Sequence, residues 1–274
     1  MSLEEKIITT GITDQGLVRD HNEDSSSRDD ELGLLVLADG MGGHKGGEIA
    51  SAIAIDTILK ELRKILPEIK TGNIDDRTGY SLESMAIEEA IKTANTNIFD
   101  AAKSNIKYEG MGTTIVVLLF YNNRITVAHV GDSRLYRMRD QTLEQMTRDH
   151  TLLQELVDRG FYTKKEARES LNKNLITRAV GVNATVDVDL LEEVALPGDL
   201  YLLCSDGLTD MITDDLIEDI QLNYKDDLQK MNMELIKQAK EHGGKDNVSA
   251  MLAQVIKEFP ANAAWFSRIT NLFS

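Results

Sequence analysis

The sequence predicts an α+β fold in which helices pack outside antiparallel β-sheets. Runs of apolar residues typical of strands come in groups, and three of these runs follow one another with only short turns between them. Consecutive strands without a crossover helix between them pair antiparallel. The long amphipathic helices also come in pairs, and helices that are segregated from strands form their own layers in an α+β protein.

The first half of the chain is predicted to hold strands at 7–13 and 32–38 and helices at 48–66 and 82–103. The first strand ends in a turn at 14–16, and the second is a buried apolar run that stops at Asp39. Apolar residues at helical spacing define the first helix, which ends before Pro67.

The second half returns to strands. A hairpin is expected at Asn122-Asn123, because asparagine tolerates the positive φ that tight turns need. The remaining predicted strands lie at 114–121, 124–130, 134–139, 186–191, 200–205 and 248–256, and the remaining predicted helices lie at 214–221 and 226–241. With 274 residues the chain is long enough for one large domain or two small ones. The predicted elements all fall within 1–256, and 257–274 stands apart as a tail.

Charge and composition narrow the possible partners. The chain has 30 Lys and Arg against 46 Asp and Glu, and its net charge of −16 repels nucleic acid and anionic membranes. A site that handles phosphate would therefore need local positive charge. The N-terminus has no apolar signal core and there is a single cysteine, Cys204, so we expect a cytoplasmic protein without disulfides. Cys204 lies in an apolar strand and is expected to be a core thiol, not a nucleophile.

Acidic residues recur at strand ends and in glycine-rich turns, at Asp24, Asp39, Asp132, Asp206 and Asp246. Taken singly, an Asp next to a Gly is mostly turn chemistry. Brought together, such carboxylates would repel one another unless a cation lay between them. Ligand sets made only of oxygen favour Mg²⁺ or Mn²⁺ over Zn²⁺.

Seven short motifs occur in order along the chain: Arg19-x-x-Asn22-Glu23-Asp24, Ala38-Asp39-Gly40-Met41-Gly42-Gly43-His44, Gly110-Met111-Gly112-Thr113-Thr114, Gly131-Asp132-Ser133-Arg134, Asp149-His150-Thr151, Ser205-Asp206-Gly207-Leu208 and Gly244-Lys245-Asp246-Asn247. In this order they resemble the metal-dependent serine/threonine protein phosphatases of the PP2C type (the PPM family) in their bacterial form. The resemblance implies a four-layer α/β/β/α sandwich of two antiparallel sheets flanked by helices, with a flap at about 150–183 inside a phosphatase domain of 1–256.

The resemblance also assigns roles to residues. It implies two core metal ions, Mn²⁺ or Mg²⁺, and a possible third. The core ions would be held by Asp39, the Gly40 carbonyl, Asp206 and Asp246, with Asp24 close by, and Asp132 together with Asp206 would hold the third. Arg19 would bind the substrate phosphate, because its planar guanidinium offers paired donors to phosphate oxygens.

The implied reaction is in-line attack of a metal-activated water on phosphoserine or phosphothreonine, with Arg19, Asp39 and His44 as catalytic residues. No covalent enzyme intermediate is needed. Eukaryotic relatives have a histidine directly after the Asp-Gly pair, where this chain has Met41. The general acid is therefore either His44, in the same loop, or water.

The expected partners are phosphorylated proteins and an opposing bacterial serine/threonine kinase. The flap region has six basic and four acidic residues, a local excess of +2 that we expect to help receive acidic phosphopeptides. In the tail, apolar residues at helical spacing either pack back on the domain or dock to another protein. Contact with a membrane surface is expected only through this tail. These residues are Trp265, Phe266, Ile269, Leu272 and Phe273.

Two other functions fit parts of the sequence. A catalytically weak adaptor on the same fold would bind phosphoproteins without hydrolysing them. The glycines of 40–46 also loosely fit a dinucleotide-binding turn, but Asp39 would repel a pyrophosphate, and the next predicted strand after this helix lies too far along the chain for one βαβ unit.

Overall fold

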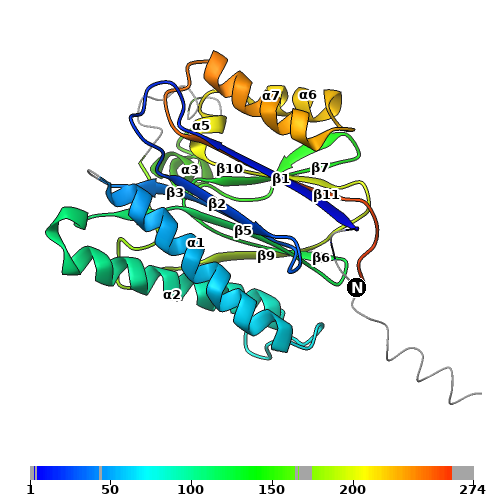
Figure 1. The fold of residues 1–274 in the computed structure, drawn as a ribbon, viewed down its shortest axis with the longest axis horizontal. Coiled ribbons are helices and arrows are strands. Elements are labelled where there is room, and N and C mark those ends of the chain that lie inside the picture. Colours follow the sequence, from blue (N-terminus) through cyan, green and yellow to red (C-terminus); the bar gives the residue numbers. More distant parts are fainter. Residues whose placement is uncertain (1–2, 4, 43–44, 164–165, 167–174, 261–274) are drawn as a thin grey trace, which may run out of the picture.

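Two antiparallel β-sheets lie face to face, and helices cover the outer face of each sheet (Figure 1). The computed structural model describes residue 3 and residues 5–42, 45–163, 166 and 175–260. Every pairing between the strands of this part of the chain is antiparallel. The predicted four-layer arrangement is confirmed.

The first sheet has its most apolar strands in the middle. In spatial order it contains β1 (Ile7–Asp14), β11 (Val248–Val255), β10 (Leu200–Cys204), β7 (Arg134–Arg139) and β8 (Thr142–Gln145). Every residue of β10 is buried, as expected for a strand that is covered by helices on one face and by a sheet on the other. The edge strands β1 and β8 carry the more exposed residues.

The second sheet contains the hairpin expected from the sequence. Its strands are β2 (Asp24–Asp29), β3 (Leu34–Met41), β5 (Ile115–Tyr121), β6 (Arg124–Val130) and β9 (Asp189–Val194), and the short β4 (Gly112–Thr113) pairs with the end of β3. Between β5 and β6, Asn122 and Asn123 have φ of 46° and 56°. The predicted asparagine turn is confirmed.

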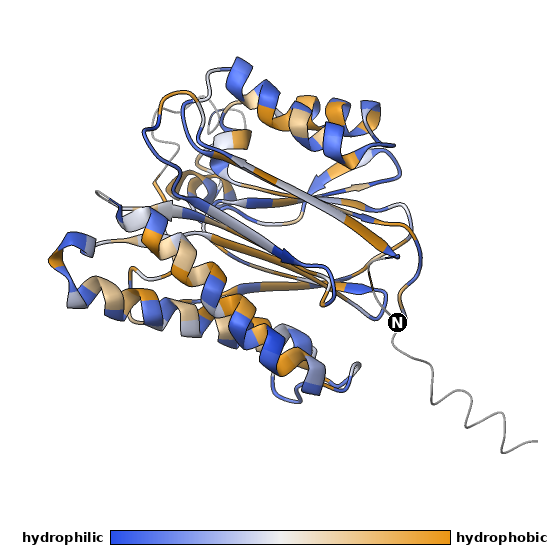
Figure 2. Cartoon of the chain, in the orientation of Figure 1, coloured by the Kyte–Doolittle hydropathy of each residue, from blue (hydrophilic) through white to orange (hydrophobic). Residues whose placement is uncertain are grey.

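The helices form the outer layers. Those over the second sheet are α1 (Gly46–Ile65) and α2 (Leu82–Ser104), those over the first sheet are α5 (Asp206–Thr209), α6 (Asp214–Asn223) and α7 (Leu228–Glu241), and the remaining helical segments are η1 (Leu66–Glu68), η2 (Ile106–Tyr108) and α3 (Leu152–Asp158). The long helices carry both apolar and hydrophilic residues (Figure 2), so each can bury one face and leave the other in water.

The interior divides into three apolar layers: one under α1 and α2, one under α6 and α7, and one between the sheets. Between the sheets, the rings of Phe120 and Tyr201 meet edge to face with their centroids 5.5 Å apart, and Phe259 packs on Phe120 at 5.9 Å. These contacts fix the distance between the two sheets, and residues at the ends of both sheets meet at the site described below.

Several elements were not predicted. The polar strand β2, the edge strand β8 and the short helices α3 and α5 all lack a clear apolar period. The strand predicted at 32–38 continues through Asp39 to Met41, so Asp39 lies within β3 and not beyond its end. The strand predicted at 186–191 lies at Asp189–Val194. Within the described part of the chain, no helix has the length and apolar character needed to cross a membrane.

Candidate metal centre

The acidic residues singled out from the sequence come together at one end of the sandwich. Asp24 opens β2 and lies opposite Asp39 on β3 in the strand register. Asp206 opens α5, two residues after the end of β10, and Asp246 precedes β11, whose start pairs with the end of β10. Asp132 lies in the connection from β6 to β7. Both sheets therefore contribute carboxylates to the same edge.

The pKa values of Asp39 and Asp206, the two central acids, are raised partly because the carboxylates lie close together. Burial is the largest cause that raises the pKa of Asp39 well above its ordinary value, and the negative charges of the other four acids raise it further. The pKa of Asp206 is raised in the same way, first by burial and then by the negative charges of Asp132, Asp210, Asp246 and Asp24. The exposed area of both residues is intermediate, yet burial is the largest cause of both pKa shifts. Each carboxylate thus disfavours the ionised form of its neighbours.

Two further acids are more deeply enclosed. Burial raises the pKa of Asp24 to about 6, although the Ser205 and Ser249 hydroxyls donate to its Oδ2 at 2.8 and 2.6 Å and oppose the shift. Burial, with the charge of Asp149, raises the pKa of Asp132 to about 6. The Oδ1 atom of Asp132 is buried without a hydrogen-bond partner.

These residues fit a site for hard divalent cations. A buried carboxylate oxygen without a donor is costly unless a cation takes the place of the donor. The repulsion that raises the pKa of Asp39 and Asp206 is relieved by the same positive charge. The donor set around the cluster consists of oxygen atoms, which Mn²⁺ and Mg²⁺ accept.

The glycine after Asp39 allows the backbones of β3 and α1 to come into contact. A Cβ atom on Gly40 would lie 2.1 Å from the Gly47 carbonyl oxygen at the start of α1. Glycine is therefore required where β3 contacts the helix, and this contact brings the Gly40 carbonyl and the Asp39 side chain to the edge of the sheet.

The threonines of the Gly112-Thr113-Thr114 motif hold the backbone of Asp39. The Thr113 hydroxyl donates to the Asp39 carbonyl at 2.8 Å, and so does the Thr114 backbone amide. The Asp39 amide donates to Thr114 Oγ1 at 3.0 Å. With these bonds in place, the side chain of Asp39 is positioned by both β3 and the start of β5.

Asn247 joins the turn before β11 to the polar segment before β2. Its side-chain amide donates to the carbonyls of Gln15 and His21, each at 2.9 Å, and its Oδ1 accepts from the Glu23 amide at 2.8 Å. Asp24 and Asp246 are thereby held in one unit, although they are more than 200 residues apart in the sequence.

Arg19 lies beside this unit. Its Nη2 donates to Asp246 Oδ2 at 2.5 Å, and its side chain is 50% exposed. The cation expected to bind phosphate therefore borders the acidic cluster while half of it remains accessible to a ligand. His44, the other predicted catalytic residue, lies outside the described residues, as do Lys164, Lys165, Arg168 and Lys173 of the flap and the apolar residues of the tail.

Asp210 was not singled out from the sequence, and Asp149 and Glu23 occur in the quoted motifs without a role assigned to them. Asp210 adds to the charge that raises the pKa of Asp206 and Asp132. Its position four residues after Asp206 could have indicated this, because residues at that spacing share one face of a helix. Asp149 pairs with Arg134 at 2.6 Å.

Two other reactive groups near the site are structural. Cys204 is fully buried, and burial raises its pKa to about 12, which agrees with the core thiol expected from the sequence. His129, His150 and Asp189 offer ligand atoms within 4.8 Å of one another and could hold an ion by geometry. However, His150 Nδ1 accepts from the Gly131 amide at 3.0 Å, so a neutral ring carries its hydrogen on Nε2, facing Asp189.

The comparisons with known proteins agree with this geometry. Residues 13–255 match the protein phosphatase 2C family. The chain belongs to the protein phosphatase 2C family. A serine/threonine phosphatase of Listeria welshimeri, named stp, is 36% identical over 248 residues, which are 88% of this chain and 93% of the relative.

Solved structures of PP2C phosphatases share the fold. The crystal structure of the serine/threonine phosphatase PstP from Mycobacterium tuberculosis superposes with a TM-score of 0.82 at 36% identity, covering 92% of this chain and all of the other. The catalytic domain of PstP in complex with two manganese ions gives a TM-score of 0.79 at 36% identity, covering 92% and 99%. The present chain is accordingly a metal-dependent serine/threonine protein phosphatase, and the comparisons do not favour the adaptor function.

Proposed function

We propose that the carboxylate cluster and Arg19 form the active site at which this PP2C phosphatase removes phosphate from phosphoserine and phosphothreonine in proteins. The observation that carries the proposal is the convergence of Asp39, Asp206 and Asp246 from both sheets, with mutual repulsion that bound cations would relieve. The half-exposed guanidinium of Arg19 beside Asp246 supports a phosphate position next to them.

In this proposal Asp39, the Gly40 carbonyl, Asp206 and Asp246 would hold two Mn²⁺ or Mg²⁺ ions, and Asp132 would help hold a third. When bound, the ions neutralise charge on the phosphoryl oxygens and lower the pKa of the attacking water. The unpartnered Oδ1 of Asp132 supports its part in this set.

The other residues of the site would orient the phosphate or hold the acidic side chains in place. Arg19 would donate from its planar guanidinium to two phosphate oxygens, and Asp246 limits the orientations that its side chain can adopt. Asp24 is fixed by Ser205 and Ser249, so its charge stays beside Asp39 without moving. Protonation of the leaving serine or threonine oxygen is assigned to His44 or to water.

We further propose a cytoplasmic location and an opposing serine/threonine protein kinase. The absence of a membrane-crossing helix in the described residues and the single buried cysteine are compatible with that location. The tail at 257–274 remains the segment through which contact with a membrane surface is proposed.

The test is hydrolysis of p-nitrophenyl phosphate and of a phosphothreonine peptide in the presence of Mn²⁺. We expect EDTA to abolish both activities and added Mn²⁺ to restore them. Activity that survives EDTA treatment, or survives in Asp39→Asn, would exclude this site as the place of the reaction.

A further inference from the structure

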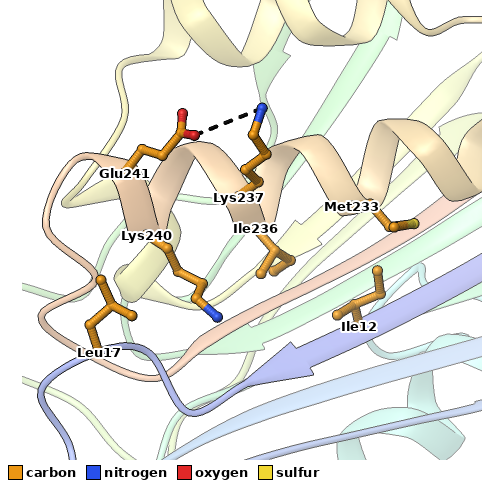
Figure 3. Close-up of a pocket in the computed structure, with 7 residues that line it drawn as sticks. All are labelled: Ile12, Leu17, Met233, Ile236, Lys237, Lys240 and Glu241. Atoms are coloured by element: carbon orange, nitrogen blue, oxygen red, sulfur yellow. Dashed lines mark ion pairs between the residues drawn. The ribbon is translucent and has the colours of Figure 1, made fainter.

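An apolar groove lies beside the metal centre, between α7 and the C-terminal end of β1 (Figure 3). Its volume is about 470 Å³, and it is lined by Ile12, Leu17, Met233, Ile236, Lys237, Lys240 and Glu241. A space of this size is within the range of sites that bind small apolar groups.

The lysines of the groove are paired with acidic side chains. Lys240 pairs with Asp14 at 2.9 Å, and Lys237 pairs with Glu241 at 3.8 Å (Figure 3) and with Glu234 at 3.2 Å. The cations at the rim are thus already compensated, while the surface between them is apolar. A neutral, apolar occupant fits better than a charged one, since a charged occupant would have to displace one of these pairs.

Two exposed apolar side chains lie at opposite ends of the groove (Figure 3). Leu17 is 63% exposed and Met233 is 57% exposed. Methionine has a flexible, polarisable side chain that adapts to differently shaped partners. The wall from α7 is therefore suited to apolar groups of more than one shape.

Leu17 is exposed but held in place. Its backbone amide donates to the Gly244 carbonyl at 2.8 Å, and the preceding Gly16 amide donates to Asp14 Oδ1 at 2.9 Å. Gln15 bonds to the Arg19 carbonyl at 2.7 Å, which closes the loop. An exposed leucine in a fixed loop can bind a ligand without the entropic cost of ordering that loop.

The groove is continuous with the proposed phosphate site. Leu17 and Arg19 belong to the same loop, and both are attached to the segment 244–246, Leu17 through the Gly244 carbonyl and Arg19 through the Asp246 carboxylate. A peptide with its phosphate on Arg19 would place neighbouring residues near Leu17. An extended chain advances about 3.3 Å per residue, so two to four residues span roughly 7–13 Å.

We propose that this groove binds an apolar side chain of the phosphoprotein substrate, located within about four residues of the phosphorylated serine or threonine. The proposal rests on the active site described above. It assigns substrate selection to Ile12, Leu17, Met233 and Ile236 and predicts a preference for Leu, Met or Phe over Ala at one flanking position.

The experiment uses phosphothreonine peptides in which one leucine is moved through the four positions on either side of an otherwise alanine sequence. We expect kcat/KM of the enzyme to be about 10-fold higher for one leucine position than for the all-alanine peptide. Met233→Ser should remove this preference. Ile106→Ser, at an exposed apolar site outside the groove, should keep it.

A variant that introduces a charge into the groove distinguishes a loss of peptide recognition from a general structural defect. Met233→Glu should disfavour the leucine peptide and favour a peptide with lysine at the same position, a gain that a damaged protein could not produce. If p-nitrophenyl phosphate is hydrolysed but all peptides react equally, the groove proposal is overturned while the active site stands. If the unmodified enzyme hydrolyses neither substrate, the active site itself is wrong.

Other occupants of the groove would also overturn the proposal. A peptide preference that appears only after deletion of 261–274 would assign the groove to the chain's own tail. A dimer in sedimentation that Met233→Glu dissociates would assign it to a second copy of the chain.

Discussion

Without a bound cation, each carboxylate of the metal centre lowers the stability of the folded protein. Asp39→Asn removes one of the mutually repelling charges, so the metal-free variant should melt roughly 2–4 °C above the metal-free parent protein. The rise in melting temperature that Mn²⁺ causes should disappear, and phosphatase activity should fall at least about 100-fold. Calorimetry with and without Mn²⁺, combined with a phosphopeptide assay, measures all three effects.

Asp219→Asn, an exposed acid on α6, is the matched control and should leave these quantities unchanged. A metal-free Asp39→Asn protein that melts below the parent would contradict the repulsion argument.

The buried histidine pair gives the protein an acid-sensitive element. Burial, with the neighbouring His129, lowers the pKa of His150 to about 4. The unfolded chain takes up this proton near pH 6.5, so the stability present above pH 6.5 is lost as the pH falls toward 4. In urea unfolding, His150→Gln should reduce this loss by an amount on the order of 1 kcal/mol per pH unit. His242→Gln, at an exposed position, should retain the full loss of stability. If the free energy of unfolding falls with pH at the same rate in both variants, the acid sensitivity does not come from His150.

The sequence singled out the five acids because each belongs to a short motif that contains glycine or asparagine. It did not indicate Asp210, whose neighbours carry no such pattern, or the roles of Thr113, Ser205 and Asn247 in holding the acids. These roles depend on hydrogen bonds between segments far apart in the chain, such as Ser249 with Asp24, and no local pattern records such contacts.

Among the elements, the short helix α5 depends on a very close backbone approach. A Cβ atom on Gly207 would lie 1.9 Å from the Asn247 carbonyl oxygen. Gly207→Ala should push α5 away from the turn that carries Asp246 and destabilise the fold by about 1–3 kcal/mol. It should also weaken Mn²⁺ binding, measured by titration calorimetry. Gly11→Ala on β1, where the nearest atoms would be 3.5 Å from the Cβ, should change neither quantity.

The elements that sequence patterns found are those with long apolar periods, such as α1, α2, β5 and β11. The strand β2 was missed because Asp24–Asp29 contains no apolar residue and is a strand only through its pairing with β3. The same holds for β8, which pairs with β7 at the edge of its sheet. Tertiary pairing therefore overrides local preference at the edges of both sheets.

At the scale of the whole molecule, cation binding should couple to global stability. Ligands that bind only the folded state stabilise it by mass action, by about 2.7 kcal/mol at a concentration 100 times the dissociation constant. We expect EDTA to lower the melting temperature of the 274-residue chain and Mn²⁺ to raise it in proportion to the logarithm of the Mn²⁺ concentration. Differential scanning fluorimetry across a Mn²⁺ series measures this, and a melting temperature independent of Mn²⁺ would argue against a built site.

The position of β11 also bears on how the chain is made. Val248–Val255 comes latest of the described strands, yet it lies between β1 and β10, inside its sheet. A growing chain on the ribosome can pair β2, β3, β5 and β6 early, but β1 must wait until Val248–Val255 has been made before its partner appears. Asp246 emerges at the same late moment. Catalytic competence should therefore arise only after synthesis has passed Val255, so that fragments ending before β11 remain inactive.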